Sequence, residues 1–455
     1  MPGQTQSSFI KWSISSITVI TLGILLYLVP RNSFTVTFSL FAIIFSAYTF
    51  IVKREDIFSF RFCITLAIIL RVLALFSLPA LSDDYFRFIW DGKMSLQHVN
   101  PFQYTPREFL ETAGTSPYLK HLYASMNSQK YHTIYPPILQ YIFAIAAYLG
   151  NGNDWMSVLI MKIFILASEI VTMRILYLLI KQYGVSTRQS LWYILNPLII
   201  IELTGNVHFE AILIFFFVLF LHFLNSKKLA FSAIFWMLSI CTKMIPLMLA
   251  PLILRYLKLR KSVIFGVLAL VTGSLLFIPF LNSHLLNDMG ASLRLFFHLF
   301  EFNASVLYVI RWIGYFYVDY DIIEQAAPIL GLITFICVLF ISFWPSKRIS
   351  LIDKSLWVFS IYFLLSSMVH PWYVAILVVL SSLTRYSYPI AFSFLIMLSY
   401  YPYSMKVFNE ETGLWWIMLE YGSLFIYITW ELLYLQRRKI NRQAIENLKN
   451  RSEFI

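Results

Sequence analysis

The chain has 455 residues, of which 59% are hydrophobic and only 13% are charged. Its mean hydropathy of +0.72 excludes an ordinary soluble domain and indicates a polytopic membrane protein. The formal net charge of +12 is explained by the excess of Lys and Arg that cytoplasmic loops carry, so nucleic-acid binding is not needed to account for it.

Apolar runs long enough to span a bilayer recur from about residue 10 to about residue 435. They predict an all-helical protein with roughly 11–14 membrane helices, short or re-entrant ones included. We expect one transmembrane domain over residues 1–435 and a basic cytoplasmic tail over 436–455. The first run has no small-residue cleavage site, so we interpret it as a retained span. No disulfide or metal set is expected from the widely separated Cys63, Cys241 and Cys337.

Basic clusters orient the predicted spans, because Lys and Arg are enriched in cytoplasmic loops. They lie at residues 53–54, 227–228, 255–261, 347–348 and 437–439. Two spans precede the first cluster, so the third span should carry Asp83 and Asp84 to the external face. The large loop that follows, about residues 81–135, is therefore expected outside, and its aromatic and proline content predicts short helices lying on the membrane.

The acid pair opens the segment DDYFRFIWDG at residues 83–92. If this segment is helical, Asp84 and Asp91 share one face, and Arg87 can pair with Asp84 or with Asp83. An external carboxylate of this kind could serve as a general base, and Asp84 is the first choice. The alternative is structural: Asp83 would cap the helix and Arg87 would neutralise its neighbour.

In the region that follows the loop, the predicted number of membrane crossings disagrees with the positions of the basic residues. The chain is expected to re-enter the lipid at residues 136–137, because two prolines are tolerated at the start of a span. Lys181 and Arg188 then fall outside by parity, although their charge favours the cytoplasm. We expect a break at residues 196–197 to resolve this. The polar segment at 202–210 that comes next should be external.

Lys243 lies in an apolar run that has basic clusters at both ends. A single span there would violate the positive-inside rule, whereas a hairpin with its turn at residues 242–246 would satisfy it. A lone charge among apolar groups costs about 2.5–3.5 kcal/mol on insertion scales. Lys243 is therefore expected to bind an anion, and the alternatives are snorkelling or a pair with a buried carboxylate such as Glu202.

Taken in order, these pieces resemble the GT-C glycosyltransferases that take sugar from a polyprenyl-phosphate carrier, particularly their bacterial mannosyltransferase-like branch. The landmarks are residues 83–92, 100–102, 134–137, Asn196-Pro197 with Glu202, His208-Phe209-Glu210, Lys243 with Pro246, residues 302–305, and His370-Pro371-Trp372-Tyr373. The chain departs from many relatives at residues 208–210, where they have His-Asn-Asp or a close variant.

The resemblance implies a GT-C-like fold and transfer of a hexose, mannose on resemblance alone, to a glycan or lipid-linked acceptor outside the bacterial plasma membrane. An inverting transfer needs a base for the acceptor hydroxyl and cations for the departing phosphate. We expect Asp84 and Asp83 as catalytic groups and Lys243, His370, Arg294 and Arg311 at the donor phosphate. The expected substrate-binding residues are Arg87, Asp91, Tyr135, Glu202, His208, Glu210, Asn303, Trp372 and Tyr373.

Several of these residues have a plain structural alternative. His370 could be an interface anchor, although Pro371 fixes it beside two aromatic residues, and Arg294 and Arg311 are of types more often found as surface cations. A polar turn between spans would also contain residues such as Glu202, His208 and Glu210.

No cofactor is favoured. Oxygen and nitrogen ligands are available in Asp83, Asp84, His208 and Glu210, but they lack compact spacing, so a divalent metal stays open. The absence of a GxGxxG or GxxxxGK motif disfavours a nucleotide-sugar donor.

The competing function is a transporter or flippase for a lipid-linked or anionic substrate, with Lys243 and the acids lining its path. Transporters often have matching broken helices in two halves, but the polar landmarks of this chain do not repeat. A noncatalytic scaffold would leave Lys243 and the acid pair unexplained.

Overall fold

The computed structural model describes residues 2–112, 116–282, 290, 300–346, 349–405 and 410–452. Throughout these residues the regular structure is helical, and the extended backbone is limited to an isolated parallel bridge between Phe302 and Met368. The expected all-helical fold is confirmed. The basic cluster at residues 347–348 lies outside the described residues.

The first part of the chain forms α1 (Pro2–Tyr27), α2 (Phe34–Lys53), α3 (Phe60–Leu75), α4 (Asp84–Leu96), α5 (Pro106–Thr112), α6 (Pro117–Ser125), α7 (Pro137–Gly150) and α8 (Asp154–Gln182). The middle part is built of η1 (Thr187–Ser190), α9 (Leu191–Ile194), α10 (Pro197–Ile199), the π-helical turn η2 (Ile200–Gly205), α11 (Glu210–Asn225), α12 (Leu229–Ile240), η3 (Ile245–Leu249), α13 (Ala250–Leu257), α14 (Leu259–Phe277) and η4 (Ile278–Phe280). The last part comprises α16 (Val306–Gly314), α17 (Ile323–Phe343), α18 (Leu351–Leu365), η5 (Pro371–Val374), α19 (Ala375–Ser381), α20 (Tyr388–Leu395), η6 (Ile396–Ser404) and α21 (Glu410–Ser452).

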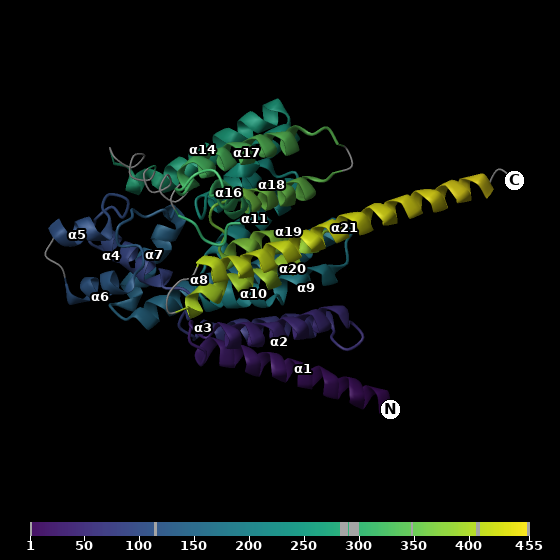
Figure 1. Ribbon diagram of the computed structural model, residues 1–455, viewed down its shortest axis with the longest axis horizontal. Helices are drawn as coiled ribbons and strands as arrows, with labels where there is room; N and C mark the ends of the chain where they lie inside the picture. Colours follow the sequence, from purple (N-terminus) through teal and green to yellow (C-terminus); the bar gives the residue numbers. More distant parts are fainter. Residues whose placement is uncertain are drawn as a thin grey trace.

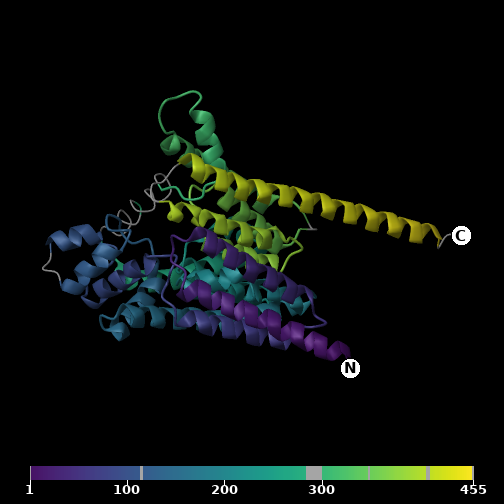
Figure 2. The same cartoon turned by 60° about the horizontal axis from the view of Figure 1, so that its bottom comes forward.

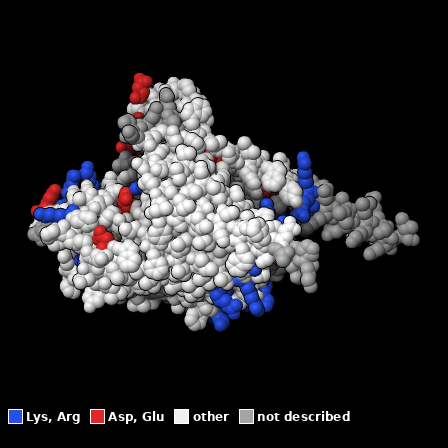
Figure 3. Space-filling model, turned by 90° about the horizontal axis from the view of Figure 1, so that it is seen from below, with Lys and Arg blue, Asp and Glu red and all other residues white. Residues whose placement is uncertain are grey.

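Several helices have the length and composition of membrane spans. Among the described residues, five are long and apolar enough to cross a membrane, and a bent pair formed by Pro197–Gly205 and Glu210–Asn225 raises the number to six. Shorter apolar helices accompany them. On the face drawn in Figure 3, charged side chains gather toward the two ends of the molecule and leave a broad uncharged belt between them. The protein is therefore a polytopic membrane protein.

The two ends of the molecule differ. Helices α4 to α7 gather at one end, which we call the loop end, whereas both chain termini lie at the opposite end, the tail end (Figures 1 and 2). Helix α21 runs past the bundle and continues without a break through residue 436, where the basic tail was expected to begin. The external loop predicted over about residues 81–135 corresponds to α4, α5, α6 and the segments that connect them.

Helix α7 does not carry the chain across the bundle. It packs against α4, and the helix that follows it begins at Asp154, whose carboxylate accepts a hydrogen bond from Tyr118 Oη (2.6 Å) and lies 2.9 Å from His121 Nε2. Since Tyr118 and His121 belong to α6, both ends of α7 stay at the loop end. The expectation that a span begins at residues 136–137 was wrong.

Helix α8 makes the crossing instead and restores the charge pattern. It ends at Gln182, and the Arg188 guanidinium that follows donates to the backbone oxygens of Ile51, Val52 and Phe58 at 2.8–2.9 Å. Arg188 therefore lies beside the basic cluster at residues 53–54, not on the opposite side as parity had suggested.

Two predicted breaks are confirmed. The helical path stops after Ile194 and resumes at Pro197, where Asn196 Oδ1 accepts a hydrogen bond from Leu198 N (3.0 Å). The apolar run around Lys243 is a hairpin: α12 ends at Ile240, η3 starts at Ile245, and Trp236 Nε1 on α12 donates to the backbone oxygen of Pro246 (3.2 Å).

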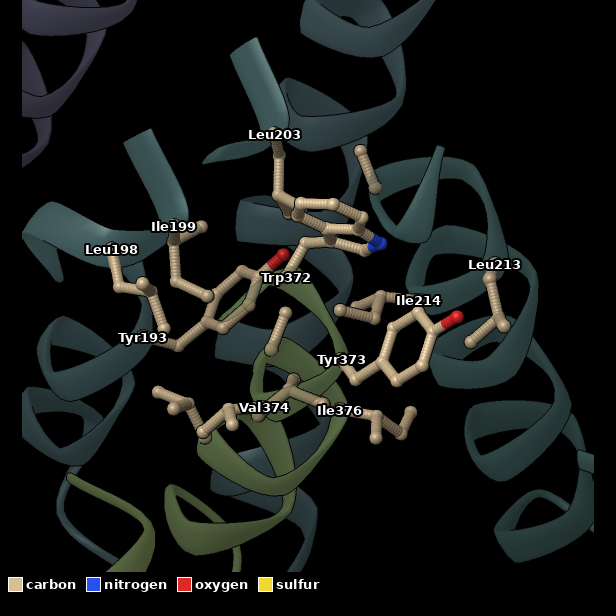
Figure 4. Close-up of a cluster of buried hydrophobic side chains, with 14 of the residues drawn as sticks. Tyr193, Leu198, Ile199, Leu203, Leu213, Ile214, Trp372, Tyr373, Val374 and Ile376 are labelled. Atoms are coloured by element: carbon tan, nitrogen blue, oxygen red, sulfur yellow. The ribbon is translucent and has the colours of Figure 1, made fainter. Parts of the chain in front are cut away.

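A tightly packed cluster of buried side chains surrounds residues 372 and 373. Figure 4 shows Tyr193, Leu198, Ile199 and Leu203 around Trp372, and Leu213 and Ile214 beside Tyr373. All six surrounding side chains are at most 1% exposed. Because lipid is as apolar as leucine, close packing rather than exclusion from water stabilises such a cluster. The cluster fixes η5 and thereby the side chains of residues 370–373.

Candidate functional site

A cavity of about 520 Å³ opens at the loop end. It lies between the start of α4, the segment before α7, the hairpin turn after α12, and segments that precede α16, η5 and α21. The lining includes the charged and polar side chains of Arg31, Asp83, Asp84, Arg87, Asn127, Lys243, Glu301 and His370. The fold thus brings together Asp83, Asp84, Lys243 and His370, as the sequence predicted.

Asp83 and Asp84 have different partners although they are adjacent. Asp83 occupies the N-cap position of α4, yet its side chain makes no capping hydrogen bond and accepts one from Arg31 Nη1 at 2.6 Å. The capping alternative is therefore wrong. Asp84 Oδ1 accepts a hydrogen bond from Asn127 Nδ2 at 3.4 Å. Among the described residues no cation pairs with Asp84, whereas the third cavity carboxylate, Glu301, lies 2.7 Å from Arg311.

The surroundings of Asp84 bear on its protonation. Burial raises the pKa of the Asp84 carboxyl, and the nearby Asp83 acts in the same direction. The Asn127 hydrogen bond and the charges of Lys243 and Arg31 oppose this change. A carboxyl of raised pKa that faces a cavity is suited to accept a proton from a bound hydroxyl.

Arg87 pairs within α4, but not with the acid pair. Its Nε lies 2.8 Å from Asp91 Oδ1, and its Nη1 donates to the backbone oxygens of Ser128 and Tyr131. Asp91 is 1% exposed and needs a cation, whereas Arg31 already neutralises Asp83, so the expected pair with residues 83–84 does not form. Arg87 still lines the cavity. Asp91 does not, and its carboxylate accepts a hydrogen bond from Thr133 Oγ1 (2.6 Å) in the segment before α7.

Lys243 has a protein anion as its partner. Its ammonium forms an ion pair with Glu210, which is buried, and lies 5.0 Å from the ring centroid of Tyr373. The carboxylate is Glu210 rather than Glu202, the one that the sequence had suggested as an alternative. An ammonium has three N–H donors, so Lys243 can hold Glu210 and a ligand in the cavity together.

Glu202 and His208 lie behind the cavity wall. Glu202 is fully buried and accepts hydrogen bonds from Tyr400 Oη (2.9 Å) and Asn206 Nδ2 (3.4 Å). His208 Nε2 lies 3.5 Å from the same carboxylate. Neither residue is part of the lining, although Tyr400 is. Both residues therefore support the cavity wall from behind.

The wall itself contains a column of stacked rings. The ring of Trp372 stacks with those of His208 and His370, at centroid distances of 3.5 Å and 4.4 Å. Phe302 extends the column beyond His370 at 4.6 Å. Trp372 is 8% exposed and lines the cavity. Tyr373 and Tyr135 also line it, so four of the expected aromatic or histidine residues meet there.

Of the remaining expected residues, two do not line the cavity and a third lies outside the described part of the chain. Asn303 is 4% exposed and donates to Glu420 at 2.8 Å, which ties it to α21. Arg311 is engaged by Glu301 and by Asp321 (2.6 Å) and does not line the cavity. Arg294 lies outside the described residues.

The structure also adds residues that the sequence reasoning missed. Arg31 and Asn127 approach the acid pair, and Tyr400 and Tyr403 complete the wall. Arg31 could have been recognised in the sequence, because a cation at the external end of the first predicted span departs from the positive-inside rule. Nothing in the sequence distinguished Asn127 or the two tyrosines. Across the described part of the chain, no three His, Cys, Asp or Glu side chains gather closely enough to hold a metal ion.

Comparison with known proteins identifies a family. The family model described as alpha-(1->6)-mannopyranosyltransferase, N-terminal domain, matches residues 16–258, which is more than half of the chain. No curated protein matches. The matched range includes Arg31, Asp83, Asp84 and Lys243, and it ends before the segment that carries His370.

Proposed function

Because the chain belongs to the alpha-(1->6)-mannopyranosyltransferase family and is therefore a membrane mannosyltransferase, we propose that it transfers mannose from a polyprenyl-phosphate carrier to a glycan or glycolipid acceptor on the external face. We further propose that the transfer inverts the anomeric centre and that Asp84 is the general base. The observation that carries this proposal is that Asp84, alone among the carboxylates lining the cavity in the described chain, has no cation as a direct partner.

The shape of the cavity supports a lipid-linked donor. Beside Lys243 the lining turns apolar, with Met244, Ile245 and Met248 from the hairpin turn and η3. Met244 is 37% exposed. A carrier could therefore lay its first isoprene units against these side chains while its phosphate meets Lys243. A nucleotide would gain nothing from this apolar flank.

The chemistry follows from the two kinds of charge. The acceptor hydroxyl attacks the anomeric carbon of mannose, and its proton passes to Asp84 as the new C–O bond forms. The bond between that carbon and the phosphate oxygen breaks, and the oxygen keeps the electron pair. Lys243, with His370 beside it, stabilises the added negative charge on the departing polyprenyl phosphate. Direct displacement in a single step inverts the configuration, so a beta-linked donor yields an alpha-linked product.

The charge distribution supports an external loop end. Basic residues at the tail end include the cluster at 53–54 with Arg188 beside it, and the residues that follow Asn225, whose side chain donates to Gln182 at 3.1 Å. Such clusters favour the cytoplasm. The cavity at the opposite end would then face the periplasmic side of a bacterial plasma membrane.

The test is sugar transfer by the purified protein in liposomes, with a panel of polyprenyl-phosphate sugars and with nucleoside-diphosphate mannose. We expect consumption of polyprenyl-phosphate mannose and an alpha-linked product. Consumption of the nucleotide sugar alone would contradict the proposed donor, and a retained configuration would contradict direct displacement. Movement of the lipid-linked sugar across the bilayer without transfer would favour the transporter alternative.

A further inference from the structure

Arg31 is the one charged residue in the short connection between α1 and α2, and it reaches the cavity from there. Its Nη1 lies 2.6 Å from Asp83 Oδ2, and its guanidinium carbon lies 3.8 Å from the ring centroid of Tyr403. The Arg31 side chain is 25% exposed. Three segments that are distant in sequence therefore meet at one guanidinium, and we call this arrangement the Arg31 clasp.

The clasp acts on the residue that starts α4. Asp83 is at the N-cap position, but its carboxylate does not cap the helix. It accepts a hydrogen bond from Arg31 instead. Asp84 follows as the first residue of α4, and its backbone N–H donates to Ser82 Oγ at 3.3 Å. Fixing Asp83 therefore fixes the backbone from which the Asp84 side chain projects into the cavity.

We propose that Arg31 is a positioning residue for the general base: it holds Asp83 and so the start of α4, and it offsets the negative charge that Asp83 places beside Asp84. This inference rests on the proposed function, in which Asp84 accepts the proton of the acceptor. Arg31 does not touch the substrate in this account, and it acts through Asp83.

The groups around Asp84 determine what loss of the clasp would do. The charged groups that face it are Asp83 at the start of α4, Arg31 from the connection between α1 and α2, and Lys243 at the hairpin turn. Its further titratable neighbours are Tyr135, Tyr373 and Tyr403. Arg31 lowers the pKa of Asp84, whereas Asp83 raises it. Loss of Arg31 removes one favourable charge and leaves Asp83 without its partner, so both effects raise the pKa further. When both groups are lost, their opposite effects on the pKa of Asp84 largely cancel.

The experiment compares the pH dependence of kcat/KM in four variants with that of the wild type. In Arg31→Gln we expect the acid limb to move up by about one pH unit, so that activity is about tenfold lower at acidic pH and recovers at alkaline pH. The double variant Arg31→Gln with Asp83→Asn should return the limb close to its wild-type position. Asp83→Asn alone should move it down. Arg54→Gln, which removes an exposed pair with Asp56 at the tail end, is the control that should move nothing.

Binding of polyprenyl phosphate is measured in the same variants, because a cation that held the phosphate would change that affinity. We expect the dissociation constant to stay within about twofold in Arg31→Gln. A tenfold weaker affinity with an unmoved acid limb would overturn the proposal, and so would a limb that stays in place in both Arg31→Gln and Asp83→Asn. If Arg31→Gln does not fold, the downward shift in Asp83→Asn decides the question. A wild type that transfers no mannose would instead contradict the proposed function.

Discussion

Asp84 combines two properties that seldom occur together at a surface: it borders a cavity, and its nearest polar partner in the described structure is an amide rather than a cation. Burial raises the pKa of this carboxyl above the ordinary value of about 4. A base works only when it is deprotonated, so wild-type kcat/KM should fall as the pH drops through this raised pKa. A pH profile measures it, and an acid limb in the ordinary carboxyl range would contradict the assignment.

The pair formed by Lys243 and Glu210 gives a prediction that separates stability from binding. Lys243→Met leaves Glu210 buried without a partner, and breaking a buried pair in this way costs about 3–5 kcal/mol. Adding Glu210→Gln should restore much of the stability, since no charge is then left unpaired. Binding of polyprenyl phosphate should stay weak in both variants because the ammonium is missing.

Thermal unfolding in detergent and binding of polyprenyl phosphate are the two readouts for this pair. Recovery of binding in the double variant would mean that Lys243 serves only to neutralise Glu210. The single variant Glu210→Gln is the matched control, since it keeps the ammonium and should retain binding.

Some site residues could be recognised in the sequence because a charged side chain in their apolar surroundings costs free energy. Lys243 in an apolar run and the acids at the end of a span are examples, since charge at such positions is unfavourable unless it is used. The tyrosines of the wall could not be recognised in this way. With 28 Tyr and 42 Phe in the chain, an aromatic residue near a span end carries almost no information. Asn127 was equally hidden, because amides are common in external loops.

At the scale of the elements, the packing of α4 against α7 determines where Asp84 projects. Gly92 makes this packing possible, because a Cβ atom at this position would lie 2.2 Å from the Phe143 carbonyl oxygen and 2.8 Å from Ala147 Cβ. Gly92→Ala must therefore push the two helices apart. We expect it to destabilise the protein by about 1–3 kcal/mol, as overpacking does, and to lower turnover.

The matched control for Gly92 is Gly266→Ala in α14, where an added Cβ meets nothing within 4 Å. That change should be neutral or slightly stabilising, because alanine favours a helix by roughly 1 kcal/mol over glycine. Thermal unfolding and turnover are compared for both. Equal behaviour of the two variants would show that the α4 and α7 contact does not matter for the site.

Charge made the hairpin at residues 242–246 predictable, because it removes a violation of the positive-inside rule. The break at 196–197 was predicted for the same reason, but the position of Arg188 beside residues 51–58 is explained by α7 staying at the loop end and not by this break. The course of α7 could not be foreseen. Its fourteen residues are apolar enough to suggest a span, whereas the contacts of Asp154 with Tyr118 and His121 place both of its ends at one side. Such contacts between distant segments leave no periodic trace in a sequence.

For the whole molecule, the account predicts that the loop end is external. Lys120 on α6 and Lys228 after α11 are both exposed and lie at opposite ends. In a background without cysteines, Lys120→Cys should react with an impermeant thiol reagent from outside intact cells, and Lys228→Cys should react only after the membrane is opened. The reverse pattern would place the cavity in the cytoplasm and contradict the proposed orientation.

The most direct test of the central claim is to measure turnover and donor affinity together for the wild type, Asp84→Asn and Asp83→Asn with polyprenyl-phosphate mannose. Asp84→Asn should lower kcat by about 100- to 10,000-fold and leave the dissociation constant of the donor nearly unchanged, because the base is lost while the phosphate contacts remain. Asp83→Asn should lose much less. Near-normal turnover in Asp84→Asn, or the larger loss in Asp83→Asn, would contradict the assignment of Asp84 as the base.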